Sequence, residues 1–537
     1  MRGIAVVDCE TDPFKVGRYP RPFLWGYFDG STYKEFERTA NLIRFLKPQP
    51  LIVYAHNGGK FDWHFILDAL APYDEVMIIN GRVSKCWLGM AELRDSFNIL
   101  PIALAKYKKD KIDYRIMEEK VRHRPENWAK IRSYLKSDCV YLYELISRFV
   151  DEFGLQITQA SAAMSQWKKL SGVEIPNTSK EYFKELMPYY YGGRVECFRT
   201  GIIDTRFSVY DINSAYPYAM TFAHPYSEEF VHESGYLKGA DFYKVECVSR
   251  GALPYRGEGN PDESAGLRFP NDGERRVYTV TQWELAAALE TRTVERVKYL
   301  ESYAFLGKMN FRTYIEKFYN MRLEAQKRGD TAADLFAKLL MNSLYGKFAS
   351  NPENYRQYMI IPMDVIPGLQ SLGWDFGGEL GPWGLAEAKL EGEQERYYNV
   401  ATSASITGFV RAMLWRAIVG SKGILYCDTD SIATEDRGRG VLLGVTLGAW
   451  KHEGDFDKAG IAGKKLYIFR GAPNAKGNRK NKFASKGVKL SETDLWRVAS
   501  GVEVTVTGEV PTYSAQKAPH FTTRRIKFTA KAERGTK

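Results

Sequence analysis

The sequence has few cysteines, no long apolar run and no internal repeat, and each absence removes a class of protein. Six cysteines in 537 residues include no Cys-x-x-Cys pair, which argues against a zinc module and against a disulfide framework. No stretch approaches the roughly 18 apolar residues of a membrane helix. The apolar start at residues 4–7, IAVV, is too short for a signal peptide. We therefore expect a soluble, intracellular protein that does not associate with membranes.

Positive charge is in excess. The formal net charge is +11 and the pI is near 9.0, which favours a polyanionic partner because basic surfaces release counterions from nucleic acid. Ribosomal proteins and membrane-surface proteins share this property. A chain of 537 residues exceeds a single hydrophobic core, and its hydrophobic content of 44% suits globular folding. We expect two or more folded domains that bind nucleic acid.

A pair of acids marks the segment ILYCDTDSIAT, where Asp428 and Asp430 stand two residues apart between apolar residues typical of β-strands. Strand side chains alternate, so carboxylates at this spacing can address one side of a hairpin. Nucleotidyl transfer uses two hard cations, and Mg²⁺ prefers carboxylate, phosphate and water oxygens. A single Asp-x-Asp is more often a solvated turn, so other segments must support the metal interpretation.

Two further segments do so. In FSVYDINSAYPYAM a β-rich run delivers Asp211 at its end. In DLFAKLLMNSLYGKF, Lys338, Asn342 and Tyr345 share one helical face, and Gly346 fits a helix C-terminus. An amine, an amide and a phenol on one face suit a nucleoside triphosphate. The alternative is an amphipathic helix with a polar stripe.

The N-terminal part has its own acids. Asp8 and Glu10 follow an apolar strand, and Asp62 follows a second strand, LIVY. Later, Tyr134 precedes Asp138 by one helical turn. These four acids could converge around two metal ions and hydrolyse a phosphodiester, with Tyr134 orienting the attacking water.

Taken together, the three segments DINSAYP, KLLMNSLYG and YCDTDS resemble motifs A, B and C of family B DNA polymerases, in the family's order. The resemblance is strongest to the protein-primed branch found in bacteriophages, adenoviruses and linear plasmids. It implies that Asp211 and Asp430 hold two catalytic Mg²⁺ or Mn²⁺ ions, with Asp428 assisting. The nucleotide-binding residues that it implies are Tyr216, Lys338, Asn342 and Tyr345, of which Tyr216 would exclude a 2′-hydroxyl. Lys465 and Tyr467 match the Lys-x-Tyr motif that steadies the primer terminus.

The N-terminal acids resemble the three exonuclease motifs of proofreading polymerases: Asp-x-Glu, Asn-x-x-x-Phe-Asp and Tyr-x-x-x-Asp. Asp8, Glu10, Asp62 and Asp138 would then hold two metal ions. Lys109 matches a lysine that assists this chemistry, although Lys108 and Lys111 carry the same charge. The resemblance also implies DNA-contacting residues, with Phe97 where the family has Leu: Asn57, Phe61, Ser96, Phe97, Tyr190, Gly192 and Gly193.

The expected fold is α/β and α+β: an RNase H-like 3′–5′ exonuclease domain at 1–155, then a right-hand polymerase domain at 156–537. Within the latter we expect a palm at about 190–225 and 397–475, fingers at about 310–350 and a thumb at about 490–537. A first insertion is expected at about 226–305, with a loop over residues 256–276, and a second at about 351–396, read as β-hairpins. Basic residues at 476–489 and in the last fourteen residues suit a thumb on duplex DNA, or a solvated tail.

The main hypothesis is a monomeric DNA-dependent DNA polymerase with a proofreading exonuclease, acting on primer-template DNA and dNTPs. The resemblance implies protein priming by a terminal protein, and the second insertion implies processive, strand-displacing synthesis. One alternative keeps the fold but uses ordinary DNA primers. Another is a nuclease whose polymerase half only clamps DNA. A third, a basic structural DNA- or RNA-binding protein, predicts no metal dependence.

Overall fold

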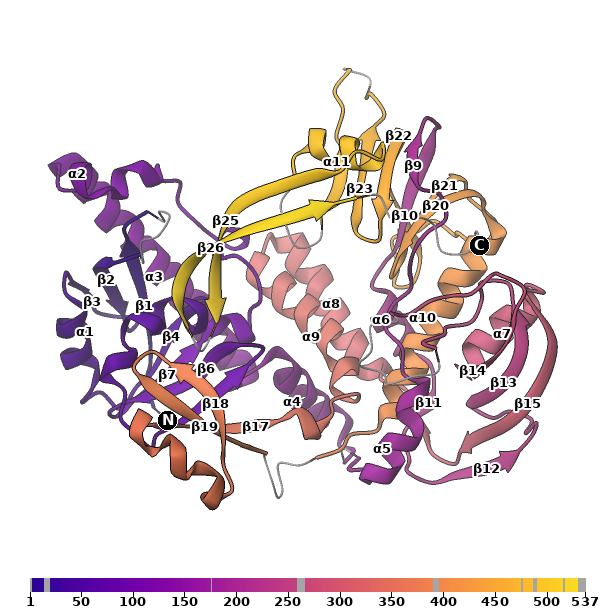
Figure 1. The fold of residues 1–537 in the computed structure, drawn as a ribbon, viewed down its shortest axis with the longest axis horizontal. Coiled ribbons are helices and arrows are strands. Elements are labelled where there is room, and N and C mark those ends of the chain that lie inside the picture. The colour runs from indigo at the N-terminus through magenta and orange to yellow at the C-terminus, as the bar shows by residue number, and fades with distance from the viewer. Residues whose placement is uncertain are drawn as a thin grey trace.

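The computed structural model describes residues 2–13, 20–174, 176–257, 266–389, 396–474, 477–485, 490–514 and 517–529; for residues 507–514 and 517–526 it describes the backbone alone. Figure 1 shows an α/β unit formed by the N-terminal part and a second, mixed unit on the opposite side. Two helices, α8 (Arg312–Arg328) and α9 (Thr331–Lys347), stand between the two units. A long hairpin, β25 (Val504–Ser514) and β26 (Lys517–Phe528), arches over them.

The N-terminal unit is built on a mixed sheet with the order β3-β2-β1-β4-β7-β6-β5, in which β1 pairs in parallel with β4, and β4 with β7. Its strands are β1 (Ile4–Thr11), β2 (Pro22–Phe28), β3 (Tyr33–Phe36), β4 (Ile52–Ala55), β5 (Glu75–Ile79), β6 (Arg82–Leu88) and β7 (Ala91–Asp95). The helix α1 (Thr39–Leu46) buries Leu42 and Leu46.

The long helix α3 (Pro125–Phe153) packs against β1 and β2. Pro125 suits its first turn because that position has no intrahelical partner for an N–H group. Gly154, at a φ of +80°, ends it. The helix thereby carries Tyr134 and Asp138 to the sheet.

A distant segment extends this sheet to ten strands. Strand β17 (Arg356–Ile361) pairs with β5, and β19 (Trp383–Lys389) and β18 (Asp375–Leu380) follow in the order β18-β19-β17-β5. The buried side chains of Ile360, Leu380 and Leu385 join the core of the N-terminal unit. The predicted second insertion is therefore continuous with the N-terminal sheet, which no local pattern indicates.

Part of this insertion contradicts the expected hairpins. Residues 363–372 form a 3₁₀ helix, η9 (Met363–Leu372), with Pro367 inside it and Gly373, at a φ of +79°, after it. The glycine and proline content was misleading because Gly373 terminates helical turns instead of a hairpin. The hairpin interpretation holds for β18 and β19 alone.

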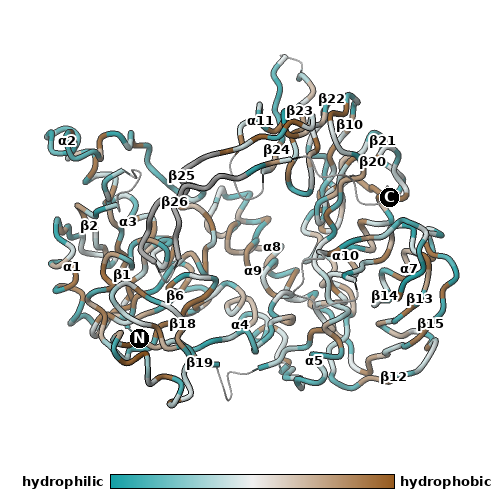
Figure 2. Tube along the Cα trace, viewed as in Figure 1, coloured by the Kyte–Doolittle hydropathy of each residue, from teal (hydrophilic) through white to brown (hydrophobic). Residues whose placement is uncertain are grey.

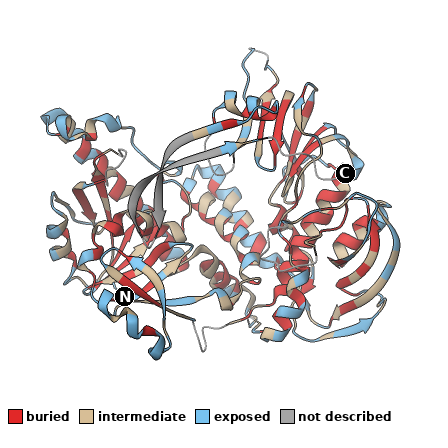
Figure 3. Cartoon of the chain, viewed as in Figure 1, coloured by how far each residue is buried: buried red, intermediate tan, exposed pale blue. Residues whose placement is uncertain are grey.

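The second unit is built on an eight-stranded sheet with the order β24-β23-β22-β10-β21-β20-β8, and β9 pairs with β22. Its strands are β8 (Val195–Cys197), β9 (Gly201–Ile203), β10 (Phe207–Ile212), β20 (Lys422–Asp428), β21 (Ser431–Asp436), β22 (Trp450–Gly463), β23 (Leu466–Gly471) and β24 (Lys482–Ser485). Helices α4 (Gln159–Ser171), α5 (Lys180–Leu186) and α6 (Ala215–Ala219) accompany it. The helix α10 (Val400–Gly420) is buried along most of its length, as Figure 3 shows.

Between α6 and α8, the described residues form a smaller sheet with the order β12-β15-β13-β14, accompanied by the helix α7 (Gln282–Glu290). The strands are β12 (Phe230–Ser234), β13 (Phe242–Ser249), β14 (Arg275–Thr281) and β15 (Val294–Phe305). A two-stranded pair, β11 (His224–Pro225) and β16 (Lys308–Met309), brackets this sheet. The predicted loop at 256–276 lies between β13 and β14, and its residues 258–265 are outside the described part.

Helices α8 and α9 form an antiparallel hairpin. Gly329 caps α8 at a φ of +69°, and the Asp330 side chain accepts a hydrogen bond from Ala333 N at 3.1 Å as the N-cap of α9. The far end of α9 differs from expectation, because the helix continues through Gly346 and is capped by Phe348 in a right-handed conformation.

The C-terminal part consists of α11 (Glu492–Ala499) and the β25–β26 hairpin, whose tip approaches the N-terminal unit at β18 and at η2 (Asp62–Phe65). Of the basic residues expected here, Lys476, Lys486, Lys489, Lys531 and Arg534 lie outside the described residues, as do the side chains of Arg524 and Arg525.

One core cluster runs from α3 of the N-terminal unit through α8 and α9 to α10. Figure 2 shows the corresponding contrast between hydrophobic segments along interior strands such as β23 and a hydrophilic periphery such as α2 (Glu119–Arg122). No helix in the described part of the chain is long and apolar enough to cross a membrane.

Candidate functional site

Three predicted acids meet at one edge of the eight-stranded sheet, and we refer to Asp211, Asp428 and Asp430 as the sheet-edge cluster. Strand β21 is flanked by β10 and β20, and both Asp211 and Asp428 stand opposite Ser431. Ile212 N donates to Asp430 O at 2.8 Å. Thr429, at a φ of +62°, turns the chain between the two acids. Acids more than 200 positions apart are therefore neighbours because of strand register.

The sheet-edge cluster concentrates negative charge. Burial and the charges of Asp430 and Glu453 raise the pKa of Asp211 to about 7. Burial and the charge of Asp428 raise the pKa of Asp430 to about 6. Glu453 comes from β22 and pairs with Lys482, and no sequence motif pointed to it. A divalent cation would relieve this repulsion.

Lys465 lies at the same edge, with its Nζ 3.3 Å from Asp428 Oδ1. Its backbone has a φ of +57°, and its amide donates to the Tyr426 hydroxyl at 2.9 Å. Tyr467 is buried, with its ring centroid 4.4 Å from that of Phe469. The structure therefore places Lys465 beside the acids, whereas most of the Tyr467 ring belongs to the core.

Two of the predicted nucleotide-binding residues, Tyr216 and Tyr345, lie within reach of the charge of Asp430. The rings of Tyr216 and Tyr345 are stacked, with centroids 4.5 Å apart and planes within 5°. Lys338 and Asn342 are exposed on α9, and Asn342 Nδ2 donates to Lys338 O at 2.8 Å. Residues from α6 and from α9 thus form one surface.

The Gly192–Gly193 segment lies against this surface. A side chain at Gly193 would come within 2.8 Å of Thr429 Cγ2 and 3.1 Å of the Tyr216 hydroxyl, so only glycine fits. Arg411 on α10 donates to the carbonyls of Tyr191 at 2.6 Å and Gly192 at 2.8 Å.

Two more groups hold this segment. Arg411 is almost fully buried and pairs with the equally buried Glu284 on α7 at 2.7 Å. Arg256 donates to the carbonyl of Tyr190 at 2.8 Å. Neither Arg411 nor Glu284 lies in a motif, so sequence reasoning had no signal for them.

The four N-terminal acids form a second group, which we call the N-terminal cluster: Asp8, Glu10, Asp62 and Asp138. They come from β1, η2 and α3. Burial and the charges of Asp62 and Asp138 raise the pKa of Asp8 well above its usual value. Burial, followed by the charge of Asp138, raises the pKa of Glu10 to about 8, and burial raises that of Asp62 to about 7.

The N-terminal cluster has unsatisfied oxygens. Asp62 Oδ1 and Asp138 Oδ1 are buried and have no hydrogen-bond partner. Such atoms fit a divalent cation, because a buried carboxylate without a partner is costly. Within the described residues, no three His, Cys, Asp or Glu side chains are already arranged as a metal site. Cations here would take the remaining ligands from substrate phosphate and water, as Mg²⁺ commonly does.

The structure gives Lys108 and Lys109 different partners. Lys109 Nζ lies 3.0 Å from Asp138 Oδ2, whereas Lys108 pairs with the exposed Glu144 at 2.8 Å. The Tyr134 hydroxyl is 3.0 Å from that of Tyr114, an exposed residue that sequence reasoning missed. Lys109 and Tyr134 thus both reach the N-terminal cluster.

The Ser96 side chain is fully buried, with its hydroxyl 3.0 Å from His56 Nδ1 and 3.2 Å from Ala55 O. Its role in this structure is to hold the loop. Phe97, Asn57 and Phe61 are partly exposed and remain available for contact.

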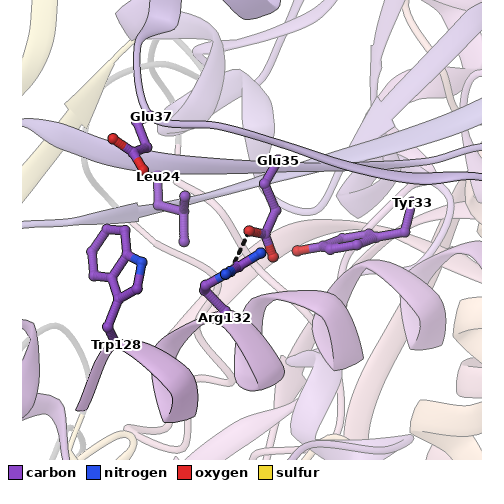
Figure 4. Close-up of a pocket in the computed structure, with 6 residues that line it drawn as sticks. All are labelled: Leu24, Tyr33, Glu35, Glu37, Trp128 and Arg132. Carbon is purple, nitrogen blue, oxygen red and sulfur yellow. Dashed lines mark hydrogen bonds and ion pairs between the residues drawn. The ribbon is translucent and has the colours of Figure 1, made fainter. Parts of the chain in front are cut away.

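A cavity of about 420 Å³ lies on the N-terminal unit at the start of α3 (Figure 4), and its lining residue Leu24 stands opposite Glu10 in the β1–β2 register. Its lining residues are Leu24, Tyr33, Glu35, Glu37, Trp128 and Arg132. None of these was predicted as a site residue.

Comparisons with known proteins agree with this arrangement. Residues 103–371 match the family described as DNA polymerase type B, organellar and viral. The DNA-directed DNA polymerase of Enterobacteria phage PRD1 is 36% identical over 502 residues, which cover 92% of this chain and 86% of the relative.

Two solved structures of phi29 DNA polymerase share the fold. The orthorhombic crystal form has a TM-score of 0.76 at 20% identity, covering 99% of this chain and 100% of that chain. The ternary complex with primer-template DNA and incoming nucleotide substrates has a TM-score of 0.75 at 20% identity, with the same coverage. These matches confirm the predicted fold class. Together with the family match and the PRD1 relative, they establish that the chain belongs to the organellar and viral type B DNA polymerases.

Proposed function

We infer that this protein is a DNA-dependent DNA polymerase with a separate 3′–5′ proofreading exonuclease. The observation that carries the inference is the meeting of Asp211 and Asp430 at one sheet edge, while four other acids converge on a different unit. Family membership and the relative named as a DNA-directed DNA polymerase support the first activity. The exonuclease rests on the N-terminal cluster itself.

The sheet-edge cluster suits nucleotidyl transfer. Asp211 and Asp430 would hold two Mg²⁺ or Mn²⁺ ions, which when bound stabilise the attacking and leaving oxygens of an in-line displacement. Lys338, exposed on α9, would meet the triphosphate, and Tyr216, stacked on Tyr345, would exclude a 2′-hydroxyl. Lys465 offsets the charge of Asp428 and can contact the primer terminus.

The N-terminal cluster suits phosphodiester hydrolysis. Asp8, Glu10, Asp62 and Asp138 would hold the two cations of this second site. Lys109, paired with Asp138, offsets part of the negative charge, and Tyr134 presents a hydroxyl that can orient the attacking water. Partly exposed Phe97 and Phe61 are suited to stack on bases of a single-stranded end.

The long-range contacts suggest how DNA is retained. The β25–β26 hairpin approaches β18 and η2, so C-terminal, inserted and N-terminal elements together close around the α8–α9 side of the molecule. This arrangement supports processive, strand-displacing synthesis. The priming partner that we propose is a terminal protein; incubation with candidate primer proteins and one dNTP should give a covalent nucleotide adduct.

One pair of variants tests the two activities. Asp430→Asn should lower Mg²⁺-dependent primer extension by at least about 100-fold, because it removes a metal-binding carboxylate, and should leave hydrolysis of single-stranded DNA intact. Asp62→Asn should do the reverse. Asp436→Asn and Asp68→Asn are matched controls, since both replace exposed acids a short way along the chain, Asp436 at the far end of the strand that follows Asp430 and Asp68 six residues after Asp62.

Extension that survives Asp430→Asn would overturn the assignment of the sheet-edge cluster. An intact chain that hydrolyses DNA but never extends a primer would instead favour a nuclease with a DNA-clamping second unit. Binding without any metal dependence would favour a structural nucleic-acid-binding protein.

A further inference from the structure

The end of α3 is joined to the turn between α8 and α9 by a two-pronged ion pair. Arg148 Nη1 donates to Asp330 Oδ1 at 2.8 Å, and Arg148 Nη2 donates to Asp330 Oδ2 at 2.6 Å. Parallel hydrogen bonds of this kind fix geometry as well as charge. The pair therefore ties the helix of the N-terminal cluster to the helix that carries the nucleotide-binding residues.

Asp330 also caps the N-terminus of α9. The same Oδ1 accepts the hydrogen bond from Ala333 N that caps α9. Because Gly329 caps α8 on the other side, the turn consists of two residues and leaves little slack. The ion pair with Arg148 therefore helps to fix the position of the first turn of α9.

Aromatic side chains near Arg148 on α3 pack against both helices of the α8–α9 hairpin. Phe149 and Phe153 of α3 both contact Phe336 of α9 edge-on, with ring centroids 5.3 Å and 5.8 Å apart. Phe153 also lies 6.2 Å from Phe318 of α8. All four rings are buried, so α3 supports both helices of the hairpin.

Side-chain hydrogen bonds link α8 to α9 along the hairpin, so a movement of the turn would also move the later part of α9. Arg322 Nε and Gln326 Nε2 of α8 both donate to Asp334 Oδ1 of α9 at 2.9 Å, and the Tyr314 hydroxyl donates to Leu340 O at 2.9 Å. Lys338 lies eight residues beyond Asp330, about 12 Å along the axis.

The same face of α3 also holds the segment that contains Lys108 and Lys109. One helical turn before Arg148, Glu144 binds Lys108, next to Lys109 of the N-terminal cluster. Consecutive turns of α3 therefore contact elements of both sites: Glu144 holds the segment next to Lys109, and Arg148 holds the α8–α9 turn.

On this basis we propose that Arg148 is a positioning residue for polymerisation: through Asp330 it sets the orientation in which α9 presents Lys338 to the incoming triphosphate. The proposal rests on the polymerase function inferred above. Arg148 touches no substrate and acts from the unit that carries the exonuclease. Its loss therefore weakens nucleotide binding without altering either set of catalytic acids.

The ion pair is partly exposed, with 42% of the Arg148 side chain and 23% of the Asp330 side chain accessible, so its effect is moderate. For Arg148→Met we expect the KM for dNTP to rise about three- to tenfold, while kcat at saturating dNTP and hydrolysis of single-stranded DNA stay near the parent values. A general loss of folding would lower all three together.

The test is a double-mutant cycle on the full chain. Asp330→Asn retains a capping side chain for α9 but weakens the pair, so it separates the ion pair from the cap. If the pair carries the effect, Arg148→Met and Asp330→Asn each raise the KM, and the double variant is no worse than the stronger single variant. Arg148→Lys, which keeps the charge but not the two-pronged geometry, should give an intermediate KM.

The matched control is Arg132→Met. Arg132 pairs with Glu35 at 2.5 Å beside the cavity (Figure 4). It lies on the same helix, 16 residues or about 24 Å before Arg148. Its removal should leave the KM unchanged. An unchanged KM in both Arg148→Met and Asp330→Asn, measured in a parent that does extend primers, would overturn the proposal. A parent that extends no primer would instead refute the proposed function.

Discussion

At the scale of single residues, the surroundings of a side chain decide its chemistry more than its type does. Lys108, Lys109 and Lys111 are equivalent by charge and lie in one short segment. The structure gives Lys109 alone the buried Asp138 as a partner, and gives Lys108 the exposed Glu144. Ser96 shows the converse: its motif suggested contact with DNA, whereas the structure buries its side chain.

Burial also creates a pH-dependent residue outside both clusters. His224 is fully buried, with its Nε2 2.7 Å from Ala219 O and its Nδ1 2.8 Å from Ser405 Oγ. Burial lowers the pKa of His224 from 6.5 to about 4. Because the folded protein binds this proton less tightly than the unfolded chain, the stability contributed by His224 is present above pH 6.5 and is lost as pH falls toward 4.

We therefore predict that His224 accounts for a loss of about 2 kcal/mol in the free energy of unfolding between pH 7 and pH 5. His224→Gln keeps hydrogen-bonding groups but cannot titrate, so its stability should fall less steeply over that interval. Urea unfolding at pH 7, 6 and 5 measures both slopes. The exposed His232→Gln is the control, and parallel slopes for parent and His224→Gln would contradict the prediction.

At the scale of elements, local signals were reliable where a short turn joined two periodic segments. Gly329 and Asp330 predicted the α8–α9 turn because one residue favours positive φ and the other caps a helix. The same reasoning failed at residues 363–372, where glycine and proline lie within and after a 3₁₀ helix. Composition alone does not distinguish a residue that ends a helix from one that turns a hairpin.

Trp383 provides one of several contacts that hold the β18–β19 hairpin against the N-terminal unit. Trp383 Nε1 donates to Leu67 O at 2.8 Å, and its ring packs against the shared core. Trp383→Ala should loosen this hairpin and shorten products made in one binding event by about two- to fivefold, since large-to-small changes at packed sites cost several kcal/mol. Primer extension with a DNA trap measures product length.

Trp374→Ala is the control for this prediction, because Trp374 packs within the insertion instead of onto the N-terminal unit. Hydrolysis of single-stranded DNA should be unchanged in both variants. Equal product lengths for Trp383→Ala and Trp374→Ala would show that the Trp383 contact has no part in retaining DNA.

At the scale of the whole molecule, elements far apart in sequence share one sheet and one core. Strand β17 pairs with β5 and buries Ile360 among residues of the N-terminal unit. The insertion is therefore part of the N-terminal sheet and core, although its length in the sequence suggested a separate unit. Removing the insertion would uncover the β5 edge.

Deleting roughly residues 351–395 should still allow short gaps to be filled but make synthesis distributive. The structure adds a second expectation: the melting temperature should fall by several degrees, because Ile360, Leu380 and Leu385 leave the shared core. Product length after a single binding event and thermal melting measure the two effects. Unchanged product length would refute the retention role, and unchanged melting would refute the shared core.

The sequence by itself predicted which side chains would carry the chemistry, and it determined which elements hold them. Acids directly after apolar strands, and Lys338, Asn342 and Tyr345 at helical spacing, depend on local periodicity, which neighbouring residues settle. The family order of the three motifs added the expected fold.

Only the tertiary structure decided which of these residues meet. Asp211 and Asp430 are neighbours through strand register, β17 joins β5 across the chain, and Arg148 reaches Asp330 over 182 positions. Such contacts depend on how whole faces pack and on which buried groups find partners. No local pattern encodes them, because the residues of one segment favour a helix or a strand without specifying which distant element it will pack against.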